Sequence, residues 1–145
     1  MIPKFRAWDE EANIMVYSDH RTRKLYDVYY GFEMNGKGLL ECHWEGDYTE
    51  SHVLDGGTLD NIMQYTGLKD KNGVEIFEGD IVSDQYANIY TPIFRNGIYM
   101  AYNVEYLHLT EQEPSTQFNV VWKNGCEIIG DIYEKPELLE KGENR

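Results

Sequence analysis

Hydrophobic and polar residues alternate along several short segments of the chain, and this alternation predicts β-strands. The clearest run spans Leu40–Glu45: Leu40, Cys42 and Trp44 would face one side of a sheet, and the intervening Glu41, His43 and Glu45 the other. The same period recurs from Ile98 to Tyr106 and from Phe118 to Trp122. The pattern predicts strands over residues 3–8, 14–18, 24–33, 38–45, 74–83, 88–95, 97–107, 117–123 and 126–133.

Four Asn-Gly dipeptides lie between these segments, and each is predicted to turn a β-hairpin. They begin at Asn35, Asn72, Asn96 and Asn124. A two-residue type I′ turn needs positive φ at both central residues, and Asn followed by Gly meets that need at the lowest steric cost. The fold is therefore expected to be mainly β and rich in hairpins.

Signals for helix are few. Pro136–Lys141 is predicted to be a short terminal helix, with Pro in its first turn and Gly142 as its stop. One further helical turn is expected between Thr58 and Gln64. The segments Ser83–Ala87 and Thr110–Thr116 have the weakest pattern and are predicted to be exposed loops.

Length and composition limit the possible number of domains and the cellular location of the protein. The chain has 145 residues, enough for one domain with its own core, with or without a substantial appendage. Its apolar runs are too short to span a membrane, and its first residues lack the apolar core of a secretory signal. The two cysteines, Cys42 and Cys126, suit a reducing compartment better than a disulfide scaffold. We therefore expect a cytoplasmic protein.

The charge balance is strongly acidic. The chain has 26 acidic and 13 basic residues, which gives a net charge of −13. Such a field repels nucleic-acid backbones and anionic membrane surfaces. The 12 tyrosines are also numerous, and Tyr suits partly wet interfaces as well as cores. Composition argues against direct binding to nucleic acid or membrane and is compatible with protein–protein contact.

The stretch from Met63 to Val82 is rich in glycine and could be taken for a phosphate-binding loop. Its glycines, Gly67, Gly73 and Gly79, fit neither the dinucleotide-binding spacing nor that of the P-loop. Turn chemistry explains them better: Gly67 would end a turn over residues 64–66, and Asp70 to Gly73 would form a hairpin loop. Glu78-Gly79-Asp80 would form a bend in which the Asp80 carboxylate accepts backbone N–H groups.

No residue is predicted to be catalytic, to bind a cofactor or to ligate a metal. The carboxylates near the bend could form an acid/base pair, but a solvated face is the simpler interpretation in so acidic a chain: Glu75, Glu78, Asp80 and Asp84. The histidines are scattered along the sequence: His20, His43, His52 and His108. Cys42 and His43 are neighbours on a predicted strand, so they would point to opposite faces and could not easily share one ion.

A second acidic cluster extends from Glu33 to Asp60. It holds seven acidic residues and a single basic one, Lys37. Displayed along strand edges, these carboxylates could imitate a row of phosphates and bind a nucleic-acid-binding enzyme. The alternative is a surface that only keeps the protein soluble.

Three segments in order along the chain carry a resemblance to a known family: KFRAWD (residues 4–9), QYTGLKDKNGVEIFEGDIV (64–82) and IIGDIYEKPELLE (128–140). They resemble the hallmark segments of the YopX family, which is encoded in phages and prophages of Gram-positive bacteria. Where that family usually has Asn, this chain has Asp131 and Lys135, so the terminal helix lacks an Asn cap before Pro136.

The resemblance implies a phage-encoded protein of uncharacterised activity, and it brings no catalytic residues. It also implies an N-terminal β-rich region over residues 1–62 and a small SH3-like barrel over residues 63–145. Within the second region, residues 84–116 would form a variable loop or hairpin, and residues 136–141 the terminal helix.

These observations lead us to expect a non-enzymatic phage accessory protein that acts by protein–protein contact. The expected partner is a second copy in a homo-oligomer, or a host or phage protein. Two alternatives stay open. One is an acidic nucleic-acid mimic that binds a host enzyme, and the other is a metal-dependent hydrolase built from scattered carboxylates such as Glu75, Glu78 and Asp80.

Overall fold

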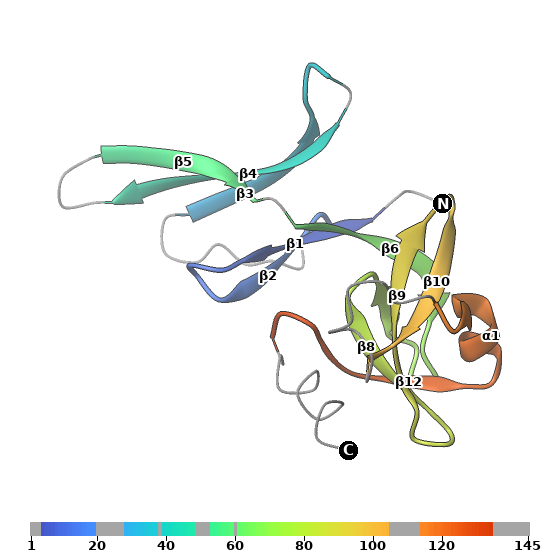
Figure 1. The fold of residues 1–145 in the computed structure, drawn as a ribbon. Helices are drawn as coiled ribbons and strands as arrows, with labels where there is room; N and C mark the ends of the chain where they lie inside the picture. Colours follow the sequence, from blue (N-terminus) through green and yellow to red (C-terminus); the bar gives the residue numbers. More distant parts are fainter. Residues whose placement is uncertain are drawn as a thin grey trace. The chain divides into compact units, whose positions relative to one another are not determined.

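The computed structural model describes residues 4–19, 28–37, 39–48, 53–59, 61–104 and 114–134. These residues are mainly β and rich in hairpins, which confirms the predicted fold class (Figure 1). The chain divides into two compact units, residues 1–64 and 65–145. Strand β6 (Ile62–Lys69) begins in the first unit and ends in the second.

The first unit contains two sets of antiparallel strands. β1 (Phe5–Asp9) pairs with β2 (Ile14–Tyr17) on one side and with the first residues of β6 on the other. A separate three-stranded sheet consists of β3 (Val28–Met34), β4 (Leu40–Tyr48) and β5 (Val53–Leu59), with β4 in the centre (Figure 1).

A small core holds this unit together. Ala7, Val16 and Cys42 are buried in it, and the aromatic rings of Tyr30 and Phe32 pack against them. Cys42 therefore lies on the inner face of β4. Cys42 is buried as the predicted alternation requires and Glu45 is exposed, whereas Leu40 and Trp44 are half-buried like Glu41 and His43.

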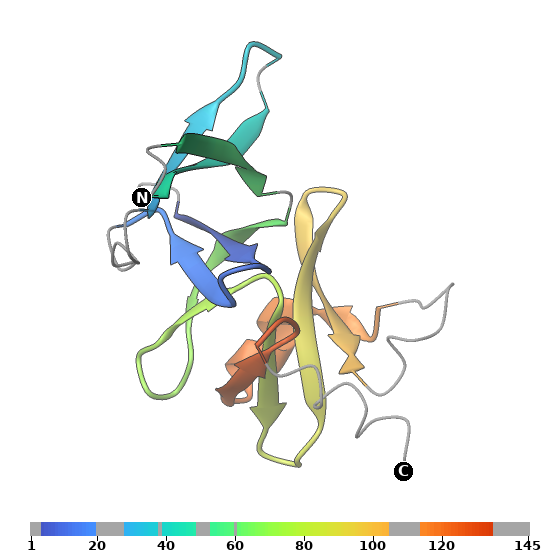
Figure 2. The same ribbon diagram turned by 90° about the vertical axis from the view of Figure 1, so that its left-hand side faces the viewer.

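The second unit is built on a five-stranded antiparallel sheet in the order β11-β10-β9-β8-β12, and its sheets curl (Figure 2). The strands are β8 (Asp80–Asp84), β9 (Ile89–Arg95), β10 (Ile98–Asn103), β11 (Thr116–Gln117) and β12 (Cys126–Asp131). The end of β6 pairs with β7 (Glu75–Phe77), and one helix, α1 (Phe118–Lys123), follows β11. The core consists of Ile76, Val82, Ala101, Phe118, Val121 and Cys126.

Helix α1 contradicts the strand predicted over residues 117–123. Phe118 and Val121 are 0% and 5% exposed, whereas Val120 is 46% exposed, so the buried positions follow a helical period and not a period of two. Gly125 has φ +86° and donates its N–H to the carbonyl of Trp122, which ends the helix. Asn124-Gly125 is thus the end of a helix and not a hairpin turn.

The region before the Gly-rich stretch also differs from the prediction. β5 and β6 are strands where a helical turn was expected between Thr58 and Gln64 and a turn over residues 64–66. Strand pairing favours the extended conformation here, because β5 pairs with β4. The buried residues Met63 and Tyr65 are also two positions apart on β6, as expected for one face of a strand. The predicted strand 74–83 is divided into β7 and β8 at Gly79, whose φ is +82°. The predicted terminal helix 136–141 lies outside the described residues.

The remaining Asn-Gly dipeptides turn hairpins in three different ways. Asn96 (φ +53°) and Gly97 (φ +86°) form the predicted type I′ turn, and Arg95 pairs with Ile98 across it. At Asn72-Gly73 only the Gly has positive φ. At Asn35 the side-chain oxygen closes the loop instead, accepting the N–H groups of Lys37 and Leu39 at 2.8 and 3.0 Å.

Candidate functional site

The Gly-rich stretch is organised by the Asp70 carboxylate. One oxygen, Oδ1, accepts the backbone N–H groups of Asn72 and Val74, both at 2.9 Å. The other, Oδ2, accepts the N–H of Ile128 at 3.0 Å and so ties the β6–β7 loop to β12. Asp70 is buried, and both of its oxygens accept backbone N–H groups, Oδ1 within the loop and Oδ2 from β12. This part of the stretch is a structural turn.

The bend at Glu78-Gly79-Asp80 has the form predicted from the sequence. Gly79 has positive φ, and Asp80, which is 4% exposed, accepts the N–H of Phe77 on Oδ2 at 2.8 Å. The Gly79 carbonyl accepts the N–H of Ile132 at 2.9 Å, which links the bend to the residue after β12. The side chains of this bend close a turn, as predicted.

Three of the four carboxylates considered as an acid/base pair, those of Glu78, Asp80 and Asp84, accept backbone N–H groups from different segments. The Glu78 carboxylate accepts the N–H of Phe94 at 3.0 Å, while Asp80 bonds to Phe77. Asp84 accepts the N–H groups of Tyr86 and Asn88 in the β8–β9 turn, both at 2.9 Å. Within the ranges that the structure describes, no group of three or more His, Cys, Asp or Glu side chains is placed to hold a metal ion.

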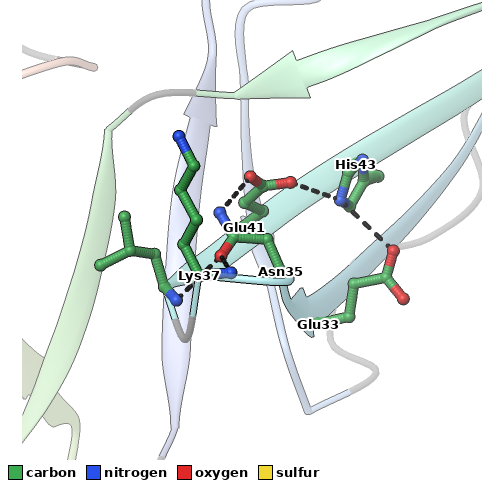
Figure 3. Close-up of polar contacts among 6 residues, drawn as sticks. Glu33, Asn35, Lys37, Glu41 and His43 are labelled. Carbon is green, nitrogen blue, oxygen red and sulfur yellow. Dashed lines mark hydrogen bonds and ion pairs between the residues drawn. The ribbon is translucent and has the colours of Figure 1, made fainter.

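A polar cluster on the β3–β4 hairpin was not anticipated from the sequence. The register pairs Glu33 with Glu41 and Gly31 with His43, so the imidazole lies beside both carboxylates (Figure 3). Nε2 of His43 is 2.9 Å from Glu41 and 3.3 Å from Glu33. The second oxygen of Glu41 accepts the side-chain N–H of Asn35 at 2.6 Å. The cluster therefore connects the loop at Asn35 to the face of the sheet.

A shallow hollow of about 260 Å³ lies beside this cluster, lined by Tyr30, Gly31, Phe32, Glu33, His43 and Glu45. Gly31 contributes to it because it pairs with His43 and has no side chain; a Cβ there would meet nothing within 4 Å. The other histidines, His20, His52 and His108, lie outside the described residues. His43 is held by two glutamates, and these three side chains are not placed to hold a metal ion.

The β9–β10 hairpin differs from these acidic surfaces. Phe94 and Ile98, on either side of the Asn96-Gly97 turn, are each 47% exposed. The rings of Phe94 and Tyr99 have their centroids 5.0 Å apart, and Arg95 donates to the hydroxyl of Tyr102 at 2.8 Å. Burial, with the nearby charge of Glu78, raises the pKa of Tyr99 to about 12, so this phenol stays neutral.

The two cysteines are free and buried, one in each unit. Burial, with a smaller effect of Asp9, raises the pKa of Cys42 to about 12. Burial also raises the pKa of Cys126 to about 11, assisted by the negative charges of Asp70 and Asp84. Since the thiolate is the reactive form, neither cysteine is prepared to act as a nucleophile. No helix in the described part of the chain is long and apolar enough to cross a membrane.

The chain was compared with curated proteins, solved structures and known families, and the family comparison confirms the resemblance noted in the sequence. A search of curated proteins finds no match. Among solved structures, the crystal structure of protein EF1440 from Enterococcus faecalis is 29% identical in sequence, covering 96% of this chain and 99% of that chain, with a TM-score of 0.47. The family described as YopX protein matches residues 4–140, a range that includes all three hallmark segments. This chain belongs to the YopX family.

Proposed function

We propose that this protein is a non-enzymatic phage accessory protein that acts by protein–protein contact and self-associates through the β9–β10 hairpin. The observation that carries the proposal is the charge of this segment. Residues 85–104 contain no Asp or Glu and one Arg, in a chain whose net charge is −13. Two copies of such a chain repel each other through most of their surfaces. The hairpin is the segment at which they approach with least repulsion.

The exposed side chains of the hairpin support the same proposal. Phe94 pairs with Tyr99 and Ile98 pairs with Arg95, so the two exposed apolar residues lie on opposite faces of the hairpin. Aromatic residues and Arg are enriched at the centres of protein interfaces. The contact between Phe94 and Tyr99 orients the Phe94 ring before a partner arrives, which reduces the entropy lost on association.

The strand pairing leaves the end of the hairpin beyond its neighbours. β8 pairs with β9 at Ile89 and Tyr90, and β11 pairs with β10 at Met100 and Ala101. The pairs nearest the turn, Arg95–Ile98 and Phe94–Tyr99, lie beyond the residues that pair with β8 and β11, and Glu78 reaches the Phe94 N–H from the bend before β8. A second copy would meet Ile98 and the exposed part of Phe94, while Tyr99 packs against the core of its own unit.

Sedimentation velocity over a range of protein concentrations tests the proposal. The wild-type chain is expected to self-associate, more strongly at higher salt, because salt screens the repulsion between acidic copies. Phe94→Ser combined with Ile98→Ser should give a monomer. Val74→Ser combined with Val120→Ser is the matched control, since these residues are 49% and 46% exposed and lie outside the hairpin. A monomeric wild type, or dissociation of the control variant, would overturn self-association through the hairpin.

Calorimetric titration with divalent ions tests the non-enzymatic part of the proposal separately. The carboxylates of Glu78 and Asp80 bond to backbone N–H groups, so we expect no stoichiometric binding. Micromolar binding that disappears in Glu75→Gln or Glu78→Gln would favour the metal-dependent hydrolase instead.

A second candidate function, nucleic-acid mimicry, is favoured by the register of β3 and β4. This register places Glu33 directly opposite Glu41, and Glu45 lies further along the same face of β4. Competition in a gel shift with DNA and a basic, sequence-independent DNA-binding protein tests this function. A mimic releases the DNA, and the triple variant Glu33→Gln, Glu41→Gln and Glu45→Gln does not. If wild type and variant behave alike, the acidic face is not a mimic.

A further inference from the structure

All four Asn-Gly dipeptides can undergo deamidation, and the fold places them in different surroundings. In deamidation, the backbone nitrogen of the Gly attacks the side-chain amide carbon of the preceding Asn. A new C–N bond forms, the C–NH₂ bond breaks and ammonia leaves, which gives a cyclic succinimide. Water then opens the ring at either carbonyl and produces aspartate or isoaspartate. Because Gly has no side chain to hinder the attack, all four dipeptides have the same favourable residue after the Asn.

We propose that Asn96 is the site of spontaneous deamidation in the folded protein and that the fold protects the other three dipeptides. Asn96 and Gly97 form the exposed turn of the β9–β10 hairpin. Neither the Asn96 side chain nor the Gly97 N–H has a hydrogen-bond partner among the described residues. An added Cβ at Gly97 would meet nothing within 4 Å, so water and base reach the reacting atoms freely.

At two of the other dipeptides the attacking nitrogen is engaged. The N–H of Gly73 donates to the Asp70 carbonyl at 3.0 Å, and the N–H of Gly125 donates to the Trp122 carbonyl at 3.0 Å. Deamidation requires loss of this N–H proton and rotation of the nitrogen toward the amide carbon. Both hydrogen bonds must break first, which raises the barrier at Asn72 and Asn124.

At the fourth dipeptide the side-chain amide is held instead. The oxygen of Asn35 accepts the N–H groups of Lys37 and Leu39, and its nitrogen donates to Glu41 at 2.6 Å. Figure 3 shows these contacts around the Asn35 side chain. Rotation of the amide carbon toward the Gly36 nitrogen would break all three. The structure therefore ranks Asn96 as the fastest site.

The two products have different consequences for the hairpin. Aspartate at this position keeps the turn, because Asp-Gly also favours the type I′ conformation. Isoaspartate adds one methylene to the backbone of a two-residue turn and disrupts the pairing of Arg95 with Ile98. Either product introduces a negative charge into the segment 85–104, which otherwise has none. This inference concerns the chemistry of the turn and does not depend on self-association.

Incubation of the full chain at mildly alkaline pH in ¹⁸O-labelled water, followed by proteolysis and mass spectrometry, measures all four sites at once. In the folded protein, Asn96 is expected to react about fivefold or more faster than Asn35, Asn72 or Asn124, the factor that one net hydrogen bond provides. In guanidinium the four rates should converge, because the Asn-Gly sequence is then the shared determinant. Glu41→Ala, which removes one contact of Asn35, should accelerate deamidation at Asn35 and leave the rate at Asn96 unchanged.

Two outcomes would overturn the proposal. One is a folded protein in which another of the four sites reacts as fast as Asn96. The other is a ranking that persists in guanidinium, because the selectivity would then come from the sequence and not from the fold.

Discussion

Replacing Gly79 with Val is expected to destabilise the second unit, because Gly79 has a backbone conformation that a β-branched residue adopts only with strain. Its φ is +82°, in the left-handed region. Its N–H donates to the Pro92 carbonyl at 3.3 Å, and its carbonyl accepts the N–H of Ile132 at 2.9 Å. These two bonds hold the bend from both sides, so the chain cannot relax away from the strained conformation without losing them.

The expected loss of stability follows from the backbone strain of a residue with a Cβ at position 79. A residue with a Cβ loses about 1–2 kcal/mol in the left-handed region, and strained positions generally cost of order 1–3 kcal/mol. For a chain of this length, each kcal/mol lowers Tm by about 2–4 °C, so Gly79→Val should lower Tm by roughly 2–12 °C. Thermal and urea unfolding, followed by circular dichroism, measure the loss.

Two variants make this prediction refutable. Gly36→Val is the matched control, because a Cβ at Gly36 meets nothing within 4 Å and its φ is outside the left-handed region; we expect little change. Asp80→Asn keeps an acceptor for the Phe77 N–H and should cost about 1 kcal/mol, less than Gly79→Val. Two results would show that the Gly79 backbone does not determine the bend. One is a Gly79→Val protein as stable as wild type, and the other is an Asp80→Asn protein with a lower Tm than Gly79→Val.

Three further predictions concern other parts of the chain. Asp70→Ala should lower the free energy of unfolding by about 2–3 kcal/mol in urea titrations, because three backbone N–H groups lose their acceptor, whereas Asp70→Asn should lose less. Cys42 and Cys126 should react with a thiol reagent at pH 8 only after unfolding. Because their folded pKa values are about 12 and about 11, the free energy of unfolding should fall as pH rises above the ordinary thiol pKa of 9.0, where the unfolded chain binds fewer protons. Asn96→Asp should weaken self-association in sedimentation velocity without changing Tm, because it adds a charge to the hairpin and keeps the turn type.

Local chemistry predicted the fold well where a single residue decides the conformation. Gly79 and Gly73 have the positive φ expected from their turns, and Asp80 caps its bend. Alternation placed Cys42 inside on β4. These features depend on the backbone preference or the period of a few neighbouring residues, so the sequence contains them directly.

Tertiary pairing decided the features that the sequence did not predict. Phe118, Val120 and Trp122 alternate as in a strand, yet burial of Phe118 with Val121 makes the segment helical. The contact of His43 with Glu33 and Glu41 depends on the β3–β4 register, and the Asn35 side chain sets that register by closing a longer loop than a type I′ turn. The alternation of hydrophobic and polar residues cannot by itself fix which residues of two strands pair, because the same alternation fits several pairings.

The hallmark segments and the β9–β10 hairpin differ in how their polar groups are used. In the hallmark segments, the carboxylates of Asp70, Asp80 and Asp131 all accept backbone N–H groups, Asp131 those of Tyr133 and Glu134. A carboxylate that already accepts hydrogen bonds from backbone N–H groups cannot bind a substrate unless the turn that it closes opens. These segments therefore specify the fold. The β9–β10 hairpin lies outside them and exposes Phe94 and Ile98; its two strands contain no acidic residue, and Glu78 contacts it only through the Phe94 N–H, so it is the segment on which the proposed self-association is tested.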